Sequence, residues 1–146
     1  MLIAKSELCR LIPHSGGMCL LDGVLDWNED FIVCVSMSHR DPNNPLRRNG
    51  RLAALHSFEY GAQSIAVHGG LLARTLGRQA PPAYLAALRD ARLNIEYLDE
   101  IQERLEINAQ KLMAANGNMI YQVEILAAET ALAQAKITII AQAAGE

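Results

Sequence analysis

The order of apolar and polar residues divides this chain into strand-like runs and one long apolar segment. The first two runs, Met18 to Leu25 and Phe31 to Ser38, alternate or are continuously apolar, as half-buried and buried strands are. A polar break at residues 26–30 separates them, so we expect a hairpin. Before them, the sequence SELCRLIP suits a short helix with Ser6 as its cap and Pro13 at its end.

The long apolar segment, Leu52 to Ala73, predicts one buried helix that carries a single charge, Glu59. Residues 39–51 are rich in proline and asparagine and predict a loop, and the sequence GRQAPP at 77–82 stops the helix. A helix that is apolar nearly all round belongs in a core or an interface. A carboxylate placed there costs free energy unless it is paired or used, so Glu59 is the first candidate functional residue.

Strand-like runs make up the last third of the chain. Asn116-Gly117 lies between two of them and predicts a tight hairpin, because type I′ turns need positive φ at both central residues. We expect these runs and the first two strands to form an antiparallel sheet that curls round the helix, an α+β architecture. Edge strands in so small a sheet invite pairing with a second copy, so a dimer with a continuous sheet is expected. The runs cover residues 88–98, 104–115, 119–127 and 132–142.

Composition narrows the class of protein. With 146 residues, of which 51% are hydrophobic, the chain suits a single domain over residues 1–146. A net charge of −3 supplies no basic field for nucleic acid. The long apolar segment is not expected to enter a membrane, because Glu59, Gln63, two histidines and three glycines would be stranded in lipid.

The cysteines and the N-terminus bear on the cellular compartment. Cys9, Cys19 and Cys34 are odd in number and lack metal-ligand spacing, so we expect reduced thiols and no metal site. Charges at Lys5 and Arg10 break the N-terminal apolar run and argue against a signal peptide. We therefore expect a cytoplasmic protein.

The histidines are candidates for proton transfer. His56 precedes Glu59 by three residues, so both lie on one side of the helix, within reach of each other or of a shared ligand. His56 could equally be a packed, hydrogen-bonded residue. His68 points to the opposite side and is interpreted as structural, as is Gly61, which favours close helix packing. His39 flanks a strand and is a reserve candidate.

Two stretches, LIPHSGGMCLLDGVLD and FEYGAQSIA, resemble segments of the hotdog-fold 3-hydroxyacyl-acyl carrier protein dehydratases. In that family a Pro-His motif, apolar residues and Asp open the first strand, and a catalytic carboxylate lies in the central helix before Ala-Gln. The matching residues here are Pro13-His14, Leu20-Leu21-Asp22, and Glu59 with Ala62-Gln63. The resemblance covers roughly residues 10 to 142. The pattern NPL, RR, GRL, EY and AQ is similar to the divergent dehydratases of aryl polyene pigment pathways.

The resemblance implies a hotdog fold, in which an antiparallel sheet wraps round one long central helix. It also implies dehydration of a 3-hydroxyacyl thioester to the trans-2-enoyl thioester, in a fatty-acid-like or polyene pathway. The implied partners are an acyl carrier protein, which presents the substrate on phosphopantetheine, and a second hotdog subunit in a homodimer or a heterodimer. No other cofactor is implied. In related dehydratases the site lies between two subunits.

One departure from the family pattern concerns the catalytic histidine. The fatty-acid dehydratases carry a His-Phe-Pro-Gly loop about fourteen residues before the helix carboxylate, and its histidine is the other catalytic residue. At that place this chain has Asn44-Pro45-Leu46, with no histidine. Either His56 replaces the loop histidine, or the chemistry is weakened or absent.

Dehydration needs a base for the C2 proton, an acid that helps the C3 hydroxyl leave, and donors for the thioester oxygen. Glu59 can supply the acid; alternatively it is a buried carboxylate satisfied by Gln63. Asn44 can hydrogen-bond a substrate oxygen, and backbone N–H groups from Gly50 to Ala54 can face the developing negative charge. Tyr60 and Gln63 lie close to Glu59 in the helix and complete the expected substrate contacts.

Three arginines lie beside the expected site. Arg47, Arg48 and Arg51 could meet the acidic surface of a carrier protein or the phosphate of phosphopantetheine, although a solvated charged loop would look the same in sequence. Two other functions stay open on the same fold. One is thioester hydrolysis, in which the helix carboxylate activates water, and the other is a catalytically silent acyl-binding subunit that pairs with an active dehydratase.

Overall fold

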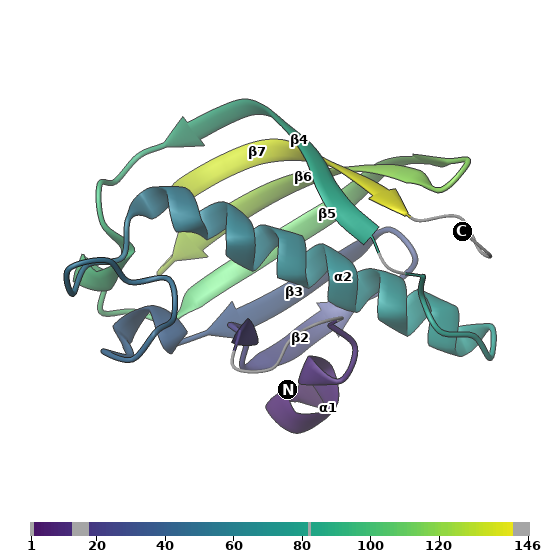
Figure 1. Ribbon diagram of the computed structural model, residues 1–146, viewed down its shortest axis with the longest axis horizontal. Helices are drawn as coiled ribbons and strands as arrows, with labels where there is room; N and C mark the ends of the chain where they lie inside the picture. The colour runs from purple at the N-terminus through teal and green to yellow at the C-terminus, as the bar shows by residue number, and fades with distance from the viewer. Residues whose placement is uncertain (1, 13–17, 82, 142–146) are drawn as a thin grey trace.

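A computed structural model describes residues 2–12, 18–81 and 83–141 (Figure 1). Short 3₁₀ turns lie at Ser38–Arg40, Ala54–His56 and Leu98–Glu100. The helices and strands, in chain order, are β1 (Ile3–Ala4), α1 (Lys5–Cys9), β2 (Gly23–Trp27), β3 (Phe31–Ser36), α2 (Ser57–Thr75), β4 (Ala83–Leu93), β5 (Leu105–Ala115), β6 (Asn118–Ala127) and β7 (Thr130–Ala141).

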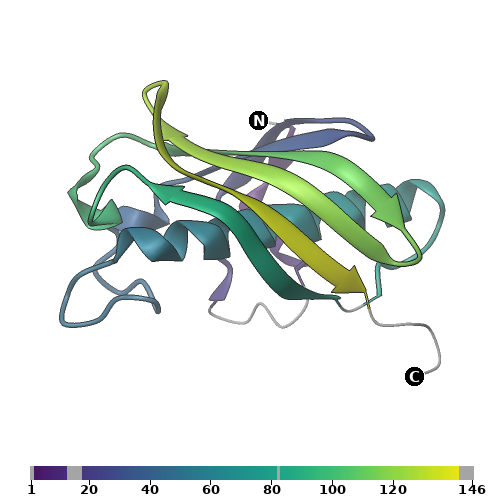
Figure 2. The same cartoon turned by 90° about the horizontal axis from the view of Figure 1, so that it is seen from above.

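The strands form one seven-stranded antiparallel sheet in the order β1-β2-β3-β5-β6-β7-β4. The sheet curves round α2, as Figures 1 and 2 show from two directions. The chain leaves α2, forms β4 at one edge and returns as β5 in the middle of the sheet. This arrangement confirms the expected α+β architecture of an antiparallel sheet wrapped round one long helix.

The turn prediction at Asn116-Gly117 is confirmed, because φ is +53° at Asn116 and +81° at Gly117, where β5 turns into β6. A second Asn-Gly pair, inside the predicted loop at residues 39–51, makes the same turn. Asn49 and Gly50 have φ of +54° and +76°, and Arg48 and Arg51 exchange both backbone hydrogen bonds across them.

Strands β2 and β4 depart most from the predicted bounds. β2 begins at Gly23 rather than at Met18, because side chains bond the backbone groups of Leu20 that a strand partner would otherwise bond. The Leu20 N–H donates to the Gln63 side chain, and the Leu20 carbonyl accepts from the Ser36 hydroxyl. β4 begins at Ala83 rather than at residue 88, since Ala83 already pairs with β7.

One face of α2 packs against the sheet and carries most of its buried residues, among them Phe58, Ile65 and Leu71. The helix approaches the sheet closely at Gly61, where an added Cβ would lie 2.8 Å from Cγ1 of Val123. The structural interpretation of Gly61 is therefore confirmed. Within the described residues, no helix is both long enough and apolar enough to span a bilayer.

The prediction of three reduced thiols is wrong for two of the cysteines. Cys9, at the end of α1, and Cys19, before β2, form a disulfide with their Cα atoms 5.8 Å apart, while Cys34 is free and buried in β3. Sequence alone could not show this, because the pairing depends on how α1 folds back against the start of β2. The Pro-His motif at 13–14 lies outside the described residues.

Strand β4 forms one edge of the sheet and has β7 as its neighbour. All of its residues except Ala87 are exposed, which is unusual for an eleven-residue strand with so many apolar side chains. Tyr84, Leu85, Leu88 and Leu93 are between 38% and 55% exposed. The expected dimer stays a prediction, and β4 is the strand that offers an unpaired edge to it.

Candidate active site

Glu59 lies in the first turn of α2, and its side chain is exposed. The prediction that Glu59 is buried is wrong for the single chain. The sheet covers only one side of α2, and Glu59 lies on the other side. Residues Ala62, Ala66, Gly69 and Ala73 follow Glu59 along this face at helical spacing and are only partly buried.

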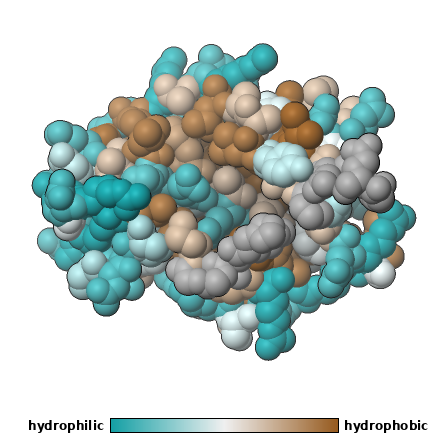
Figure 3. All heavy atoms as spheres, in the orientation of Figure 1, coloured by the Kyte–Doolittle hydropathy of each residue, from teal (hydrophilic) through white to brown (hydrophobic). Residues whose placement is uncertain are grey.

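An apolar groove of about 520 Å³ runs along this face of α2. The helix contributes Ala62, Ala66, Gly69 and Ala73, and the opposite wall comes from β4, the turn between β5 and β6, and the segment after α1. Figure 3 shows hydrophobic residues gathered on the same side of the molecule, in the part of the view where Figure 1 places β4. Glu59 thus lies one turn before an apolar groove, on the same helical face.

His56 ends the 3₁₀ turn that precedes α2, and its side chain is half-buried. Within the described part of the chain, neither His56 nor Glu59 makes a side-chain hydrogen bond or an ion pair. The two side chains are neighbours at the start of α2 without contacting each other through a hydrogen bond. Their catalytic roles stay predictions.

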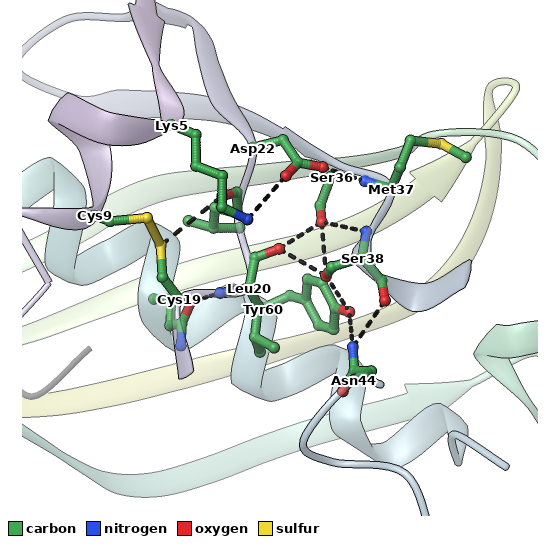
Figure 4. Close-up of polar contacts among 12 residues, drawn as sticks. Lys5, Cys9, Cys19, Leu20, Asp22, Ser36, Met37, Ser38, Asn44 and Tyr60 are labelled. Carbon is green, nitrogen blue, oxygen red and sulfur yellow. Dashed lines mark hydrogen bonds and ion pairs between the residues drawn. A yellow bond between two sulfur atoms is a disulfide. The ribbon is translucent and has the colours of Figure 1, made fainter. Parts of the chain in front are cut away.

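Tyr60 and Asn44, two of the expected substrate contacts, point into the protein (Figure 4). Tyr60 is fully buried and Asn44 is 5% exposed. Asn44 Nδ2 donates to the Tyr60 hydroxyl at 3.1 Å and to the Ser38 carbonyl at 2.9 Å, and its Oδ1 accepts the Leu46 N–H at 2.9 Å. Burial raises the pKa of Tyr60, so its hydroxyl stays protonated. A substrate contact by Asn44 would displace one of these bonds.

Two serines extend this polar cluster to the start of β2. Ser38 Oγ lies 2.8 Å from the Tyr60 hydroxyl and donates to the Leu20 carbonyl at 2.7 Å, and Ser36 Oγ donates to the same carbonyl at 2.5 Å. The cluster therefore joins α2, the end of β3 and the loop after it. Sequence reasoning missed both serines, because serines after a strand carry no distinguishing signal.

Gln63 forms hydrogen bonds with the segment before β2 rather than with Glu59. Its Oε1 accepts the Leu20 N–H at 2.8 Å, and its Nε2 donates to the Met18 carbonyl. The alternative in which Gln63 satisfies a buried Glu59 is thus wrong. Gln63 also lines the groove, so its side chain both fixes the neighbouring segment and borders the candidate site.

Arg47 holds the loop before α2 together. Its guanidinium donates to the carbonyl groups of Asp41, His39 and Gly50 at 2.9, 3.0 and 2.6 Å. The exposed Gly50 is therefore part of the turn that Arg47 fixes, and its carbonyl is already bonded.

Arg51 forms a second structural cluster. It pairs with Asp99 at 2.9 Å and Glu100 at 3.3 Å, and its guanidinium lies 3.8 Å from the centre of the Tyr97 ring. Burial alone would raise the pKa of Asp99, but hydrogen bonds from the Leu52 N–H and from Arg51 hold this pKa below its ordinary value. By contrast, Arg48 is exposed, and within the described residues its guanidinium donates only to the Arg47 carbonyl.

Most of the backbone N–H groups expected as oxyanion donors are already used. Arg51, Leu52 and Ala54 donate to the Arg48 carbonyl, the Asp99 carboxylate and the Glu96 carbonyl. That expectation is therefore corrected for these three positions. The Arg51 amide closes the turn in the loop, and the Leu52 and Ala54 amides join the loop to the segment after β4.

The other two described histidines are buried in structural positions. His68 lies between the Tyr121 hydroxyl, 2.6 Å from Nδ1, and the Asn28 carbonyl, 2.7 Å from Nε2, which confirms its structural interpretation. His39 Nε2 lies 2.9 Å from the Ile101 carbonyl. Burial lowers the pKa of both histidines. Neither lines the groove.

No group of three or more metal-ligating side chains occurs among residues 2–12, 18–81 and 83–141. The candidate site thus consists of an exposed carboxylate, a neighbouring histidine and an apolar groove. In the sequence, the groove is indicated by small residues at helical spacing, at positions 62, 66, 69 and 73. The prediction of the site did not include this spacing.

A seven-stranded antiparallel sheet wrapped round one long helix is the hotdog fold, which solved dehydratase and putative thioesterase structures share. Within this class the chain belongs to the ApeP-like dehydratase family, whose model, described as ApeP dehydratase, matches residues 6–145. No curated protein sequence matches the chain.

Solved structures with the same architecture include dehydratases and thioesterases. A chain of the dehydratase heterocomplex ApeI:P from Xenorhabdus doucetiae superposes with a TM-score of 0.85 at 21% identity, over 95% of this chain and 93% of that one. A putative thioesterase from Shewanella oneidensis has a TM-score of 0.63 at 13% identity, over 95% and 100%. The E. coli PaaI protein has a TM-score of 0.59 at 12% identity, over 82% and 78%.

Proposed function

We propose that this chain takes part in dehydrating a 3-hydroxyacyl thioester to the trans-2-enoyl thioester. The observation that carries the proposal is the position of Glu59: an exposed carboxylate on the same helical face as an apolar groove, in a chain of the dehydratase family. The groove offers an apolar surface to an acyl chain, and Glu59 offers a proton donor beside it.

The reaction removes a proton from C2 and the hydroxyl group from C3. Glu59, as the acid, would protonate the leaving hydroxyl, which departs as water, and His56 would accept the C2 proton. A carboxylic acid in this role works best where bulk water is excluded. Because Glu59 is exposed in the single chain, the proposal requires a second subunit that covers this face of α2.

We infer that the second subunit is another hotdog chain that pairs with the edge of β4. The exposed apolar residues of β4 border the same groove, as Tyr84 and Leu85 line it. A partner strand on this edge would satisfy its backbone groups and close the open side of the groove. The similar ApeI:P structure is a heterocomplex, which supports a heterodimer as well as a homodimer.

We further propose that an acyl carrier protein presents the substrate on its phosphopantetheine arm. Arg48 is the arginine best placed to meet an acidic carrier or a phosphate, since it is exposed at a turn beside α2. Arg47 and Arg51 would act indirectly, because their guanidinium groups hold the turn in shape.

The test is turnover of a 3-hydroxyacyl carrier thioester by the chain alone and by the chain together with a second hotdog subunit. We expect loss of one water, detected by mass and by enoyl absorbance. Glu59→Gln should lower kcat by roughly 10²- to 10⁴-fold, the usual contribution of a positioned acid. The matched control is Glu29→Gln, which changes an equally exposed carboxylate in the turn between β2 and β3. Unchanged turnover in Glu59→Gln would remove Glu59 from the reaction.

A catalytically silent subunit is the second candidate. It is favoured by the loop before α2, where Asn44 takes part in an internal hydrogen-bond cluster and no histidine is present at 44–46. A silent subunit would show no turnover alone, and in a heterodimer Glu59→Gln would leave the partner's rate unchanged. Release of free thiol in the same assay would instead indicate thioester hydrolysis.

A further inference from the structure

The Cys9–Cys19 disulfide joins the end of α1 to the segment that leads into β2 (Figure 4). The two cysteines are ten positions apart in sequence, and both are half-buried, so a small thiol reagent can reach them. The bond closes a covalent ring that contains Leu11 and Ile12. Leu11 lies against α2, and the function proposed above does not use the disulfide itself.

Two described residues between the cysteines form part of one wall of the groove. Leu11 and Ile12 line the groove, and Leu11 packs so closely on α2 that a Cβ at Gly70 would lie 3.1 Å from its Cβ atom. On the far side of the disulfide, Gln63 of α2 bonds the Leu20 N–H. The disulfide therefore joins two stretches that both contact α2, one through Leu11 and the other through Leu20.

The noncovalent contacts of α1 are weaker than this covalent tether. Lys5 pairs with Asp22 at 3.2 Å and Arg74 pairs with Glu7 at 2.7 Å, and each of these side chains is at least about one-third exposed. Exposed ion pairs contribute little to stability. Leu8 is fully buried and keeps α1 in place, and beyond Cys9 its carbonyl accepts a single backbone hydrogen bond, from the Leu11 N–H at 2.9 Å.

We propose that Cys9 and Cys19 form a reversible thiol–disulfide site that fixes the groove wall when oxidised and releases it when reduced. The co-reactant is a dithiol of the thioredoxin or dithiothreitol class. One thiolate of the reductant attacks one protein sulfur, which breaks the Cys9–Cys19 bond, releases the other cysteine as a thiolate and forms a mixed disulfide. The second thiolate of the reductant then attacks the reductant's own sulfur in the mixed disulfide and releases the second cysteine, and both protein thiolates take up a proton. Two electrons and two protons pass to the protein, and the reductant leaves as a disulfide.

Cys34 does not compete in this exchange. It is fully buried in β3, and burial raises the pKa of its thiol to about 12, so almost no thiolate is present at neutral pH. Thiol exchange is thereby confined to Cys9 and Cys19, and Cys34 serves as an internal reference for accessibility.

The first measurement counts thiols in the native, full-length protein. After equilibration with oxidised glutathione, a maleimide should label neither Cys9 nor Cys19. After dithiothreitol it should label both, while Cys34 reacts only on denaturation. Labelling of Cys9 and Cys19 after oxidation would overturn the proposal, as would a disulfide that dithiothreitol leaves intact in the folded protein.

The second measurement asks whether the bond fixes the wall. Reduction should lower Tm by about 5 to 10 °C, as expected for opening a short covalent ring, and should speed hydrogen exchange at Leu20. The double variant Cys9→Ser/Cys19→Ser should match the reduced wild type in both readouts, and Cys34→Ala should keep the redox response. Identical exchange and Tm in oxidised and reduced wild type would refute the groove-wall role. None of these readouts depends on turnover, so they stand apart from the dehydratase test.

Discussion

Tyr60 is the residue at which the loop before α2, the end of β3 and the helix itself meet. Its hydroxyl contacts Ser38 and Asn44, and its ring is fully buried. The phenol directly follows Glu59 in sequence, so its fixed position also fixes the start of α2. A buried hydroxyl with two polar neighbours contributes to stability mainly because its loss takes one buried hydrogen bond from each neighbour.

The substitution Tyr60→Phe tests this contribution. We expect the free energy of unfolding to fall by about 1 to 3 kcal/mol, because Ser38 and Asn44 each lose a buried hydrogen-bond partner. Urea denaturation followed by circular dichroism measures it. Tyr84→Phe is the control, since it removes the same hydroxyl from an exposed ring in β4. An equal, small effect of both substitutions would contradict the structural role of the hydroxyl.

The buried histidines predict how stability depends on pH. Burial lowers the pKa of His39 and His68 below the ordinary value of 6.5, so the unfolded chain binds protons first as the pH falls. The stability present above about pH 6.5 should therefore be lost as the pH falls from 6.5 toward the lower folded pKa values. The slope should be at most about 1.4 kcal/mol per pH unit for each histidine.

Denaturant unfolding between pH 7.5 and 5 measures this dependence. In His68→Gln, the part of the slope that comes from His68 should disappear, while the part from His39 remains. A free energy of unfolding that stays constant over this range in the wild type would contradict the assignment of both histidines as buried and neutral.

At the scale of elements, α2 has two faces with different partners. One face packs on the sheet, and the other carries Glu59 and the small residues of the groove. The two glycines Gly61 and Gly69 lie on these two faces. Gly61 approaches Val123, whereas an added Cβ at Gly69 would have no neighbour within 4 Å.

Replacing each glycine by alanine separates the two faces. Gly61→Ala should lower the free energy of unfolding by about 1 to 3 kcal/mol, because its Cβ would overlap Val123 in a packed core. Gly69→Ala should raise it by up to about 1 kcal/mol in the single chain, because alanine is the better helix former. Chemical denaturation compares them, and a destabilising Gly69→Ala would mean that this face is packed in the isolated chain.

At the scale of the whole molecule, the sheet closes round the helix on one side and stays open on the other. Strand β4 leaves a long apolar edge exposed, and the groove lies directly beside it. A second chain that extends the sheet past β4 and covers α2 would bury both the exposed edge and the groove. The site proposed for dehydration would be complete only in such an assembly.

A charge on β4 tests the assembly. Leu88→Lys should weaken association at least tenfold, because a desolvated ammonium group on the edge opposes strand pairing, while the fold of the single chain is kept. Light scattering and analytical ultracentrifugation measure association, with the second hotdog subunit present where the assembly is a heterodimer. Leu112→Lys, at an exposed position of β5, is the control. Equal association of both variants would place the interface elsewhere.

Sequence alone determined the features that depend on local chemistry. Alternation and apolar runs identified the long helix and most of the strands, and Asn116-Gly117 identified a hairpin, because pattern and turn geometry are set by residues close in the chain. The position of Glu59 in the central helix also followed from local motifs that resemble the dehydratases.

The tertiary structure decided which surfaces and side chains meet. Glu59 is exposed rather than buried because the sheet covers only one face of α2. Asn44 points toward Tyr60, and Cys9 reaches Cys19, because long-range packing brings together segments that no local pattern connects. Sequence periodicity reports that a face is apolar, but only the path of the whole sheet decides whether this face becomes core, groove or interface.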